Sequence, residues 1–181
     1  MKQFLLFALL FISITTNAEP PKWVLDKFIG LSSADSSVRQ KSAYGLKGYY
    51  TDNGTEPTQK DLNLLESNVG ELLSSLSDEN LQVRYYITEL VAARYINQYP
   101  KPPIVFVSLL EEKNIKLFKN KFFNNLNLEK DIFAKSSMKA LINLKECGYL
   151  PEMLIRAEGL SKYEKKYALK SLARFKKHCE L

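Results

Sequence analysis

The chain has 181 residues, of which 45% are hydrophobic and 12% aromatic, and its formal net charge is +6. This composition excludes an intrinsically disordered protein, and the length allows one domain with a sizeable core. The charge is uneven, because residues 101–181 carry 17 Lys/Arg against 9 Asp/Glu, whereas residues 1–100 carry 9 against 11. The C-terminal half is therefore the basic half.

The N-terminus has the order of a secretory signal peptide. Lys2 precedes an apolar run from Phe4 to Ile14, and a short polar stretch then leads to Ala18. The run has eleven residues, whereas a membrane-spanning helix needs about 20, so a cleavable signal is favoured over an anchor. We expect residues 1–18 to be removed after Ala18, which leaves residues 19–181 as a single periplasmic or secreted domain.

Helical periodicity dominates the rest of the chain. Within 58–76 and 78–97, apolar residues recur every three to five positions, which is typical of amphipathic helices. Thr58, with Asp61 three residues on, and Ser161, with Glu164, are expected caps at helix N-termini, and the second pair matches the Ser-x-x-Glu capping box. Residues 113–128 are ambiguous between a short helix and a packed loop. The expected helices span residues 21–30, 35–51, 58–76, 78–97, 102–112, 129–146, 151–158 and 161–177.

Two stretches of the chain are similar to each other at an offset of 45 residues. Asp35 and Arg39 in the first stretch stand where Asn80 and Arg84 stand in the second, and small and apolar residues follow both. The pattern resembles the HEAT-like family of helical-hairpin repeats, in which the turn residue and the arginine support successive hairpins. Two further units, near 131 and 161, keep the helix without this motif.

This resemblance implies an all-α fold, an irregular HEAT-like helical-hairpin solenoid of about three to four units. The alternative is a compact helical domain in which the two matches are chance.

Cys147 and Cys179 are the only cysteines of the chain. In an oxidising compartment an even pair more often forms a disulfide than two free thiols, so we expect the two to be bonded. A metal site at His178 and Cys179 is the weaker alternative, since it has two adjacent ligands and no third.

Residues that could carry catalysis are scarce. His178 is the single histidine, and a chain terminus is a poor place to preorganise a general base. The carboxylates at 61, 66 and 71 recur every five positions and so point in different directions around a helix. The sequence has no Gly-rich phosphate loop and no His-Glu-x-x-His motif. We expect no enzymatic activity, no metal and no cofactor.

Two surfaces are candidates for contact with a partner. In the last expected helix, cations recur about every four residues and so form one basic stripe. The basic stripe consists of Lys162, Lys166, Lys170, Arg174 and Lys177. The second candidate consists of Tyr85, Tyr86 and Tyr95, because the apolar ring of tyrosine suits a contact surface while its hydroxyl group stays in water. The alternatives are a solvated face for the stripe and a cover over a small core for the tyrosines.

These observations predict an exported, non-enzymatic protein-binding module. One specific version is an immunity-type inhibitor of a toxin that acts in the periplasm. The alternative is a peripheral envelope protein that applies the basic stripe to anionic lipid or polymer. Nucleic acid is not an expected partner, because export removes the usual substrate.

Overall fold

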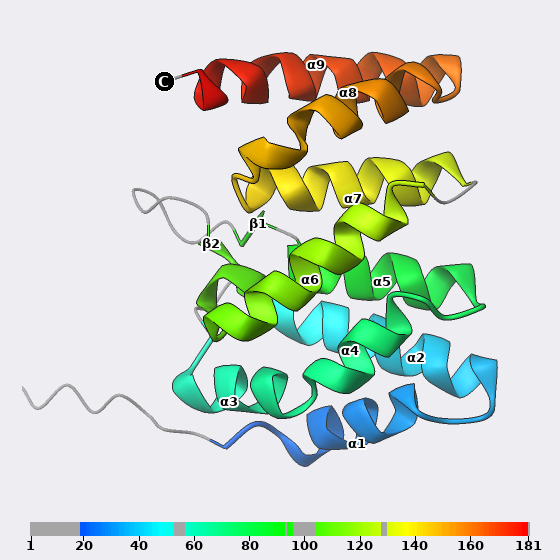
Figure 1. Ribbon diagram of the computed structural model, residues 1–181. Helices are drawn as coiled ribbons and strands as arrows, with labels where there is room; N and C mark the ends of the chain where they lie inside the picture. Colours follow the sequence, from blue (N-terminus) through cyan, green and yellow to red (C-terminus); the bar gives the residue numbers. More distant parts are fainter. Residues whose placement is uncertain (1–18, 53–56, 93, 96–103, 128–129, 181) are drawn as a thin grey trace, which may run out of the picture.

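The computed structural model (Figure 1) describes residues 19–52, 57–92, 94–95, 104–127 and 130–180. These residues are mainly helical, which confirms the expected all-α class. The α-helices are α1 (Lys22–Leu31), α2 (Ser36–Lys47), α3 (Gln59–Ser67), α4 (Val69–Ser75), α5 (Leu81–Ala92), α6 (Glu112–Asn125), α7 (Asp131–Asn143), α8 (Leu150–Glu158) and α9 (Lys162–Cys179). The shorter elements are the π-helical turn η1 (Gly48–Asp52), the antiparallel strands β1 (Arg94–Tyr95) and β2 (Ile104–Val105), and the 3-10 turns η2 (Phe106–Leu109) and η3 (Cys147–Tyr149).

The helices of the described residues pair in chain order. α1 packs on α2, α4 on α5, α6 on α7, and α8 on α9, which gives four hairpins. The second helices of the hairpins form one row, in which α2 packs on α5, α5 on α7, and α7 on α9. In the other row, α4 contacts both α1 and α6. The result is a stack that begins at α1 and ends at α9 (Figure 1).

The apolar positions of both rows make the core between them. Val83, Ile87 and Leu90 of α5 are fully buried, as the three- to four-residue spacing predicts. Phe118 and Phe122, which are buried in the same core, belong to the segment that the sequence left ambiguous. That segment is a helix, α6, and its N-terminus is capped by a side chain of α3. The Glu66 carboxylate of α3 accepts hydrogen bonds from the Glu111 N–H and the Asn114 side-chain amide.

Several expected helices have different bounds in the structure. The segment 58–76 is interrupted at Asn68, whose side-chain amide donates to the Leu64 carbonyl at 2.8 Å and so competes with the helical bonding there. The helix expected over 78–97 ends at Ala92, and the chain then enters β1. The helix expected over 102–112 is wrong: β2 and η2 occupy 104–109, where β-branched side chains favour extended backbone.

The helix expected over 129–146 ends earlier, with α7 at Asn143. Lys145 has a φ of 58°, and the Glu146 N–H donates to the Leu141 carbonyl at 3.0 Å. This six-to-one bond closes the helix as in a Schellman motif, with lysine in the left-handed position that glycine usually occupies.

Of the two expected caps, the one at Thr58 is confirmed, and it is a full capping box. Its side chain accepts from the Asp61 N–H at 3.2 Å, and the Asp61 carboxylate accepts from the Thr58 N–H at 2.8 Å. The box at Ser161 is wrong, because the Ser161 side chain makes no cap hydrogen bond. Glu164 instead pairs with Lys135 of α7 at 2.5 Å, so its carboxylate is held by the neighbouring helix.

The expected disulfide between Cys147 and Cys179 is confirmed, with the two Cα atoms 5.6 Å apart. It joins η3, which follows α7, to the last residue of α9. The final helix is therefore covalently tied to the hairpin before it. Residues 1–18, on which the predicted signal peptide falls, lie outside the described residues.

Candidate functional site

The residues of the 45-residue repeat make the same hydrogen bonds in both copies. In the first copy, Ser33 Oγ accepts from the Asp35 N–H at 3.2 Å, and Asp35 Oδ1 accepts from the Ser37 N–H at 2.8 Å. The Arg39 guanidinium then donates back to the Ser33 carbonyl at 2.9 Å. Asp35 thereby caps α2, and the N–H bonds that its carboxylate accepts hold its pKa below the usual value.

The second copy repeats these contacts at the turn before α5. Asp78 Oδ1 accepts from the Asn80 N–H at 2.7 Å, and Asn80 Oδ1 accepts from the Gln82 N–H at 2.9 Å. Arg84 donates from Nε to the Asp78 carbonyl. Both arginines therefore tie the side of their helix to the turn that precedes it.

An ion pair connects the two copies. Arg39 Nε donates to Asp78 Oδ2 at 2.7 Å, and these side chains are only 12% and 8% exposed. Glu79, which is 84% exposed, accepts a further bond from Arg39 at 3.0 Å. Burial acts to raise the pKa of Asp78, but the bonds from Arg39 and the Asn80 N–H outweigh it and hold the pKa below its usual value. We call this ion pair the interhairpin clamp.

The third unit lacks the arginine and is held differently. Arg84 lies over the ring of Phe133 of α7, with the guanidinium carbon 5.6 Å from the ring centre. Asn143 donates across the hairpins to the Ala92 carbonyl at 2.7 Å, at the end of α5. These residues of the repeat motif therefore contribute to the stack, not to an exposed site.

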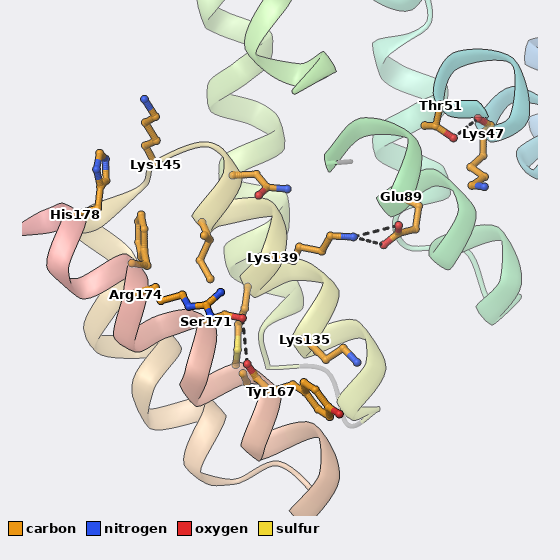
Figure 2. A pocket seen from close by; sticks show the side chains of 15 residues that line it. Lys47, Thr51, Glu89, Lys135, Lys139, Lys145, Tyr167, Ser171, Arg174 and His178 are labelled. Atoms are coloured by element: carbon orange, nitrogen blue, oxygen red, sulfur yellow. Dashed lines mark hydrogen bonds and ion pairs between the residues drawn. The ribbon is translucent and has the colours of Figure 1, made fainter. Parts of the chain in front are cut away.

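The row of second helices carries a cavity of about 790 Å³, which we call the central groove. Side chains from α2, η1, α5, α7 and α9 line it (Figure 2). The central groove is lined by Lys47, Thr51, Glu89, Lys135, Met138, Lys139, Ile142, Asn143, Lys145, Tyr167, Ala168, Ser171, Arg174, Phe175 and His178.

Apolar and charged groups have separate places in the central groove. Met138, Ala168 and Phe175 are at most 5% exposed and form its floor. Lys139 of α7 points across it to Glu89 of α5, with Nζ 3.2 Å from the carboxylate (Figure 2). Arg174 comes from the α9 side. The groove thus combines an apolar base with a charged rim.

The basic stripe on α9 is divided by the structure. Its lysines, at 162, 166, 170 and 177, are exposed, and Leu172 and Phe175 are buried on the opposite face, as the sequence predicted. Arg174, the remaining member, lines the central groove. The stripe therefore presents four lysines to the outside and one arginine to the groove.

Tyr85 and Tyr86 are half-buried on α5, on the face that also carries Glu89. Tyr86 packs edge-on against Tyr44 of α2 with ring centres 5.3 Å apart, so these tyrosines cover the contact between neighbouring hairpins. The side chain of Tyr95 lies outside the described residues.

Within the described ranges, no group of three or more His, Cys, Asp and Glu residues is arranged to hold a metal ion. The His178 ring lies beside that of Phe175 at 6.1 Å between centres. The helices in this part of the chain include none both long and apolar enough to cross a membrane.

Sequence reasoning missed most of the central groove. Lys135 and Lys139 recur at four-residue spacing, which was a readable sign of a basic face on α7. Glu89 and Lys47 gave no such sign, because nothing in the sequence places α2 and α5 beside α7.

Comparisons of the chain with protein-family models, with curated proteins and with solved structures found no match. Function has to be inferred from the central groove and the basic stripe.

Proposed function

We propose that this chain is an exported, non-enzymatic module of HEAT-like helical hairpins that binds another protein in its central groove. The observation that carries the proposal is the groove itself, which the second helices of all four hairpins build together. Apolar surface with polar groups around it is the usual anatomy of a protein contact surface. A stack of hairpins supplies such a surface without a reactive pocket.

The repeated hydrogen bonds support membership in the HEAT-like class. A chance match of two Val-Arg dipeptides would not place the same cap and the same arginine-to-carbonyl bond at a 45-residue offset. The interhairpin clamp also gives the arginine the supporting role between hairpins that the resemblance implies.

Export is part of the proposal. The Cys147–Cys179 disulfide suits an oxidising compartment, and the N-terminal pattern is that of a cleavable signal. Intact-mass measurement of the exported protein should give a chain that begins at Glu19. A mass that includes residues 1–18 would contradict cleavage and favour an anchored protein.

An immunity-type inhibitor of a periplasm-acting toxin is the specific version that we favour. A small, disulfide-linked binding module with a preformed groove is suited to blocking another protein without chemistry of its own. The partner should therefore bind in a fixed ratio and lose its activity when bound.

The experiment that tests protein binding is affinity capture from the native envelope fraction with two matched variants. Ser171→Trp places a large side chain in the central groove, whereas Ala173→Trp places it two residues away on the exposed outer face of α9. We expect a stoichiometric partner to bind the native chain and Ala173→Trp, and to be lost with Ser171→Trp. Capture that is equal for all three chains would contradict binding in the groove.

The second candidate function is attachment to an anionic envelope surface through the four outer lysines of the basic stripe. These lysines are exposed on one face of the terminal helix, where a flat surface could reach them all. Binding of this kind should weaken sharply with ionic strength. It should also be disturbed by Ala173→Trp and not by Ser171→Trp, which is the reverse of the groove hypothesis.

A further inference from the structure

The charge of the central groove is strongly unbalanced. Five cations line it, from three helices and the turn after α7, and Glu89 is the single carboxylate among the lining residues. The cations are Lys47, Lys135, Lys139, Lys145 and Arg174. A cavity walled by protein concentrates such a potential, because it keeps solvent from screening it fully.

Part of this charge is compensated within the protein. Lys139 pairs with Glu89 at 3.2 Å, and Lys135 pairs with Glu164 at 2.5 Å. For Lys145 and Arg174 the part of the chain that the structure describes offers no ion pair. The groove therefore keeps an excess of positive charge that a bound anion would balance.

The apolar lining adds a second requirement on the ligand. Met138 and Phe175 are already buried within the protein, but the half-buried Ile142 and the Tyr167 ring, which is 48% exposed, still present apolar surface to the groove. A purely ionic ligand would leave this apolar surface uncovered. A ligand that carries carboxylates and apolar side chains together would satisfy both the rim and this surface.

We propose that the central groove binds an acidic, amphipathic polypeptide segment of the partner. Its Asp and Glu carboxylates lie against Lys139, Lys145 and Arg174, and its apolar side chains cover Ile142 and Tyr167. This inference rests on the proposed function, and it adds the chemistry of the partner. A polypeptide fits better than a membrane, because a bilayer is flat whereas these groups line a cavity.

The test uses the disulfide-bonded chain from Glu19 onward and a short fluorescein-labelled peptide in which glutamates alternate with leucines. A peptide with glutamine in place of every glutamate is the neutral control. We expect the acidic peptide to bind and the neutral peptide to bind at least about tenfold more weakly, because the neutral peptide has no carboxylates to balance the positive charge of the groove. Equal binding of the two peptides would overturn the proposal.

The matched protein variants are Lys139→Glu with Arg174→Glu, in the central groove, and Lys166→Glu with Lys177→Glu, on the outer face of α9. Both pairs change the net charge equally. The groove pair should weaken the acidic peptide about tenfold or more, and the outer pair less than about twofold, because exposed charges on the outer face of α9 are screened by solvent and salt. Equal losses from the two pairs would show attraction by overall charge and overturn the site.

Folding is checked by the thermal transition in circular dichroism. If charge reversal in the groove unfolds the chain, Lys139→Gln with Arg174→Gln takes its place, with a smaller loss expected in the same direction. If this variant binds the acidic peptide as tightly as the native chain does, the proposal is overturned. Tighter binding of inorganic phosphate, heparin or anionic phosphatidylglycerol vesicles than of the peptide, through the same two residues, would overturn it in favour of a phosphate or polymer ligand.

The outcome for the acidic segment is separable from the outcome for protein binding. If Ser171→Trp abolishes capture of the native partner and the groove charge reversal does not, the proposed function stands and the acidic segment is wrong. If neither change affects capture, the partner binds elsewhere and the proposed function is wrong as well.

Discussion

Replacing Arg39 by methionine tests the interhairpin clamp directly. The change removes the guanidinium but keeps a long apolar stem, so that packing changes little. Asp78 loses two charge-assisted bonds and keeps the one from the Asn80 N–H. A carboxylate that is 8% exposed is then left without its ion-pair partner.

The cost follows from this geometry. Removing one partner of a buried ion pair costs about 3 to 5 kcal/mol, and a hydrogen bond to a charged group contributes about 1.5 to 3 kcal/mol. Because both side chains still touch solvent, we expect the free energy of unfolding to fall by about 2 to 3 kcal/mol. For a domain of this size, that loss lowers the melting temperature by about 4 to 12 °C.

Arg84→Met is the matched control. It also removes bonds from an arginine to backbone carbonyls, but it leaves the ion pair in place. The assay is urea unfolding followed by far-ultraviolet circular dichroism, with Asp78→Asn completing a double-mutant cycle with Arg39→Met. We expect a coupling energy of about 1 to 3 kcal/mol. A coupling energy near zero, or a loss no larger than that for Arg84→Met, would refute the clamp.

Three further predictions concern separate parts of the molecule. Cys179→Ser should lower the free energy of unfolding, measured by the same urea titration, by about 3 to 4 kcal/mol on the chain-entropy model. Non-reducing peptide mapping of the native chain should recover the Cys147–Cys179 pair. Two alkylatable thiols in freshly isolated protein would contradict the disulfide. Lys166→Glu with Lys170→Glu should change stability by no more than about 0.5 kcal/mol for each substitution, so unfolding of this variant would show that the stripe is packed against another element. Because the pKa of Asp78 is held below its ordinary value of 3.8, its stabilisation is fully present above that pH and is lost as the pH falls through the lowered pKa. Acid titration of stability should therefore be flatter for Asp78→Asn than for the native chain in this range, and identical curves would contradict the shift.

Local sequence signals predicted most of the helices because each rests on contacts between near neighbours. The spacing of Val83, Ile87 and Leu90 identifies the buried face of α5 whatever packs against it. The capping box at Thr58 likewise needs only a residue three positions away. Ser161 has the same local pattern but fails, because Lys135 from a different hairpin holds the carboxylate that the box requires.

The bounds that were wrong depend on longer-range contacts. α6 was ambiguous because its own sequence offers no cap, and the carboxylate that caps it belongs to Glu66 on α3. The segment 102–112, which was expected to be a helix, is rich in apolar residues. Ile104 and Val105 instead form β2, which pairs with β1 earlier in the chain. Neither contact can be deduced from spacing along one helix.

The sequence by itself determined the all-α class, the disulfide and the basic outer face of the last helix, since these follow from periodicity, cysteine count and charge. It also contained the repeated turn at Asp35 and Asn80. Only the tertiary structure decided that Arg39 reaches Asp78 of the next hairpin, and that Glu89 and Arg174 share one cavity. The physical reason is that a helix pattern states which face is buried but not which neighbour covers it, so a site built from four helices exists only once the hairpins have stacked.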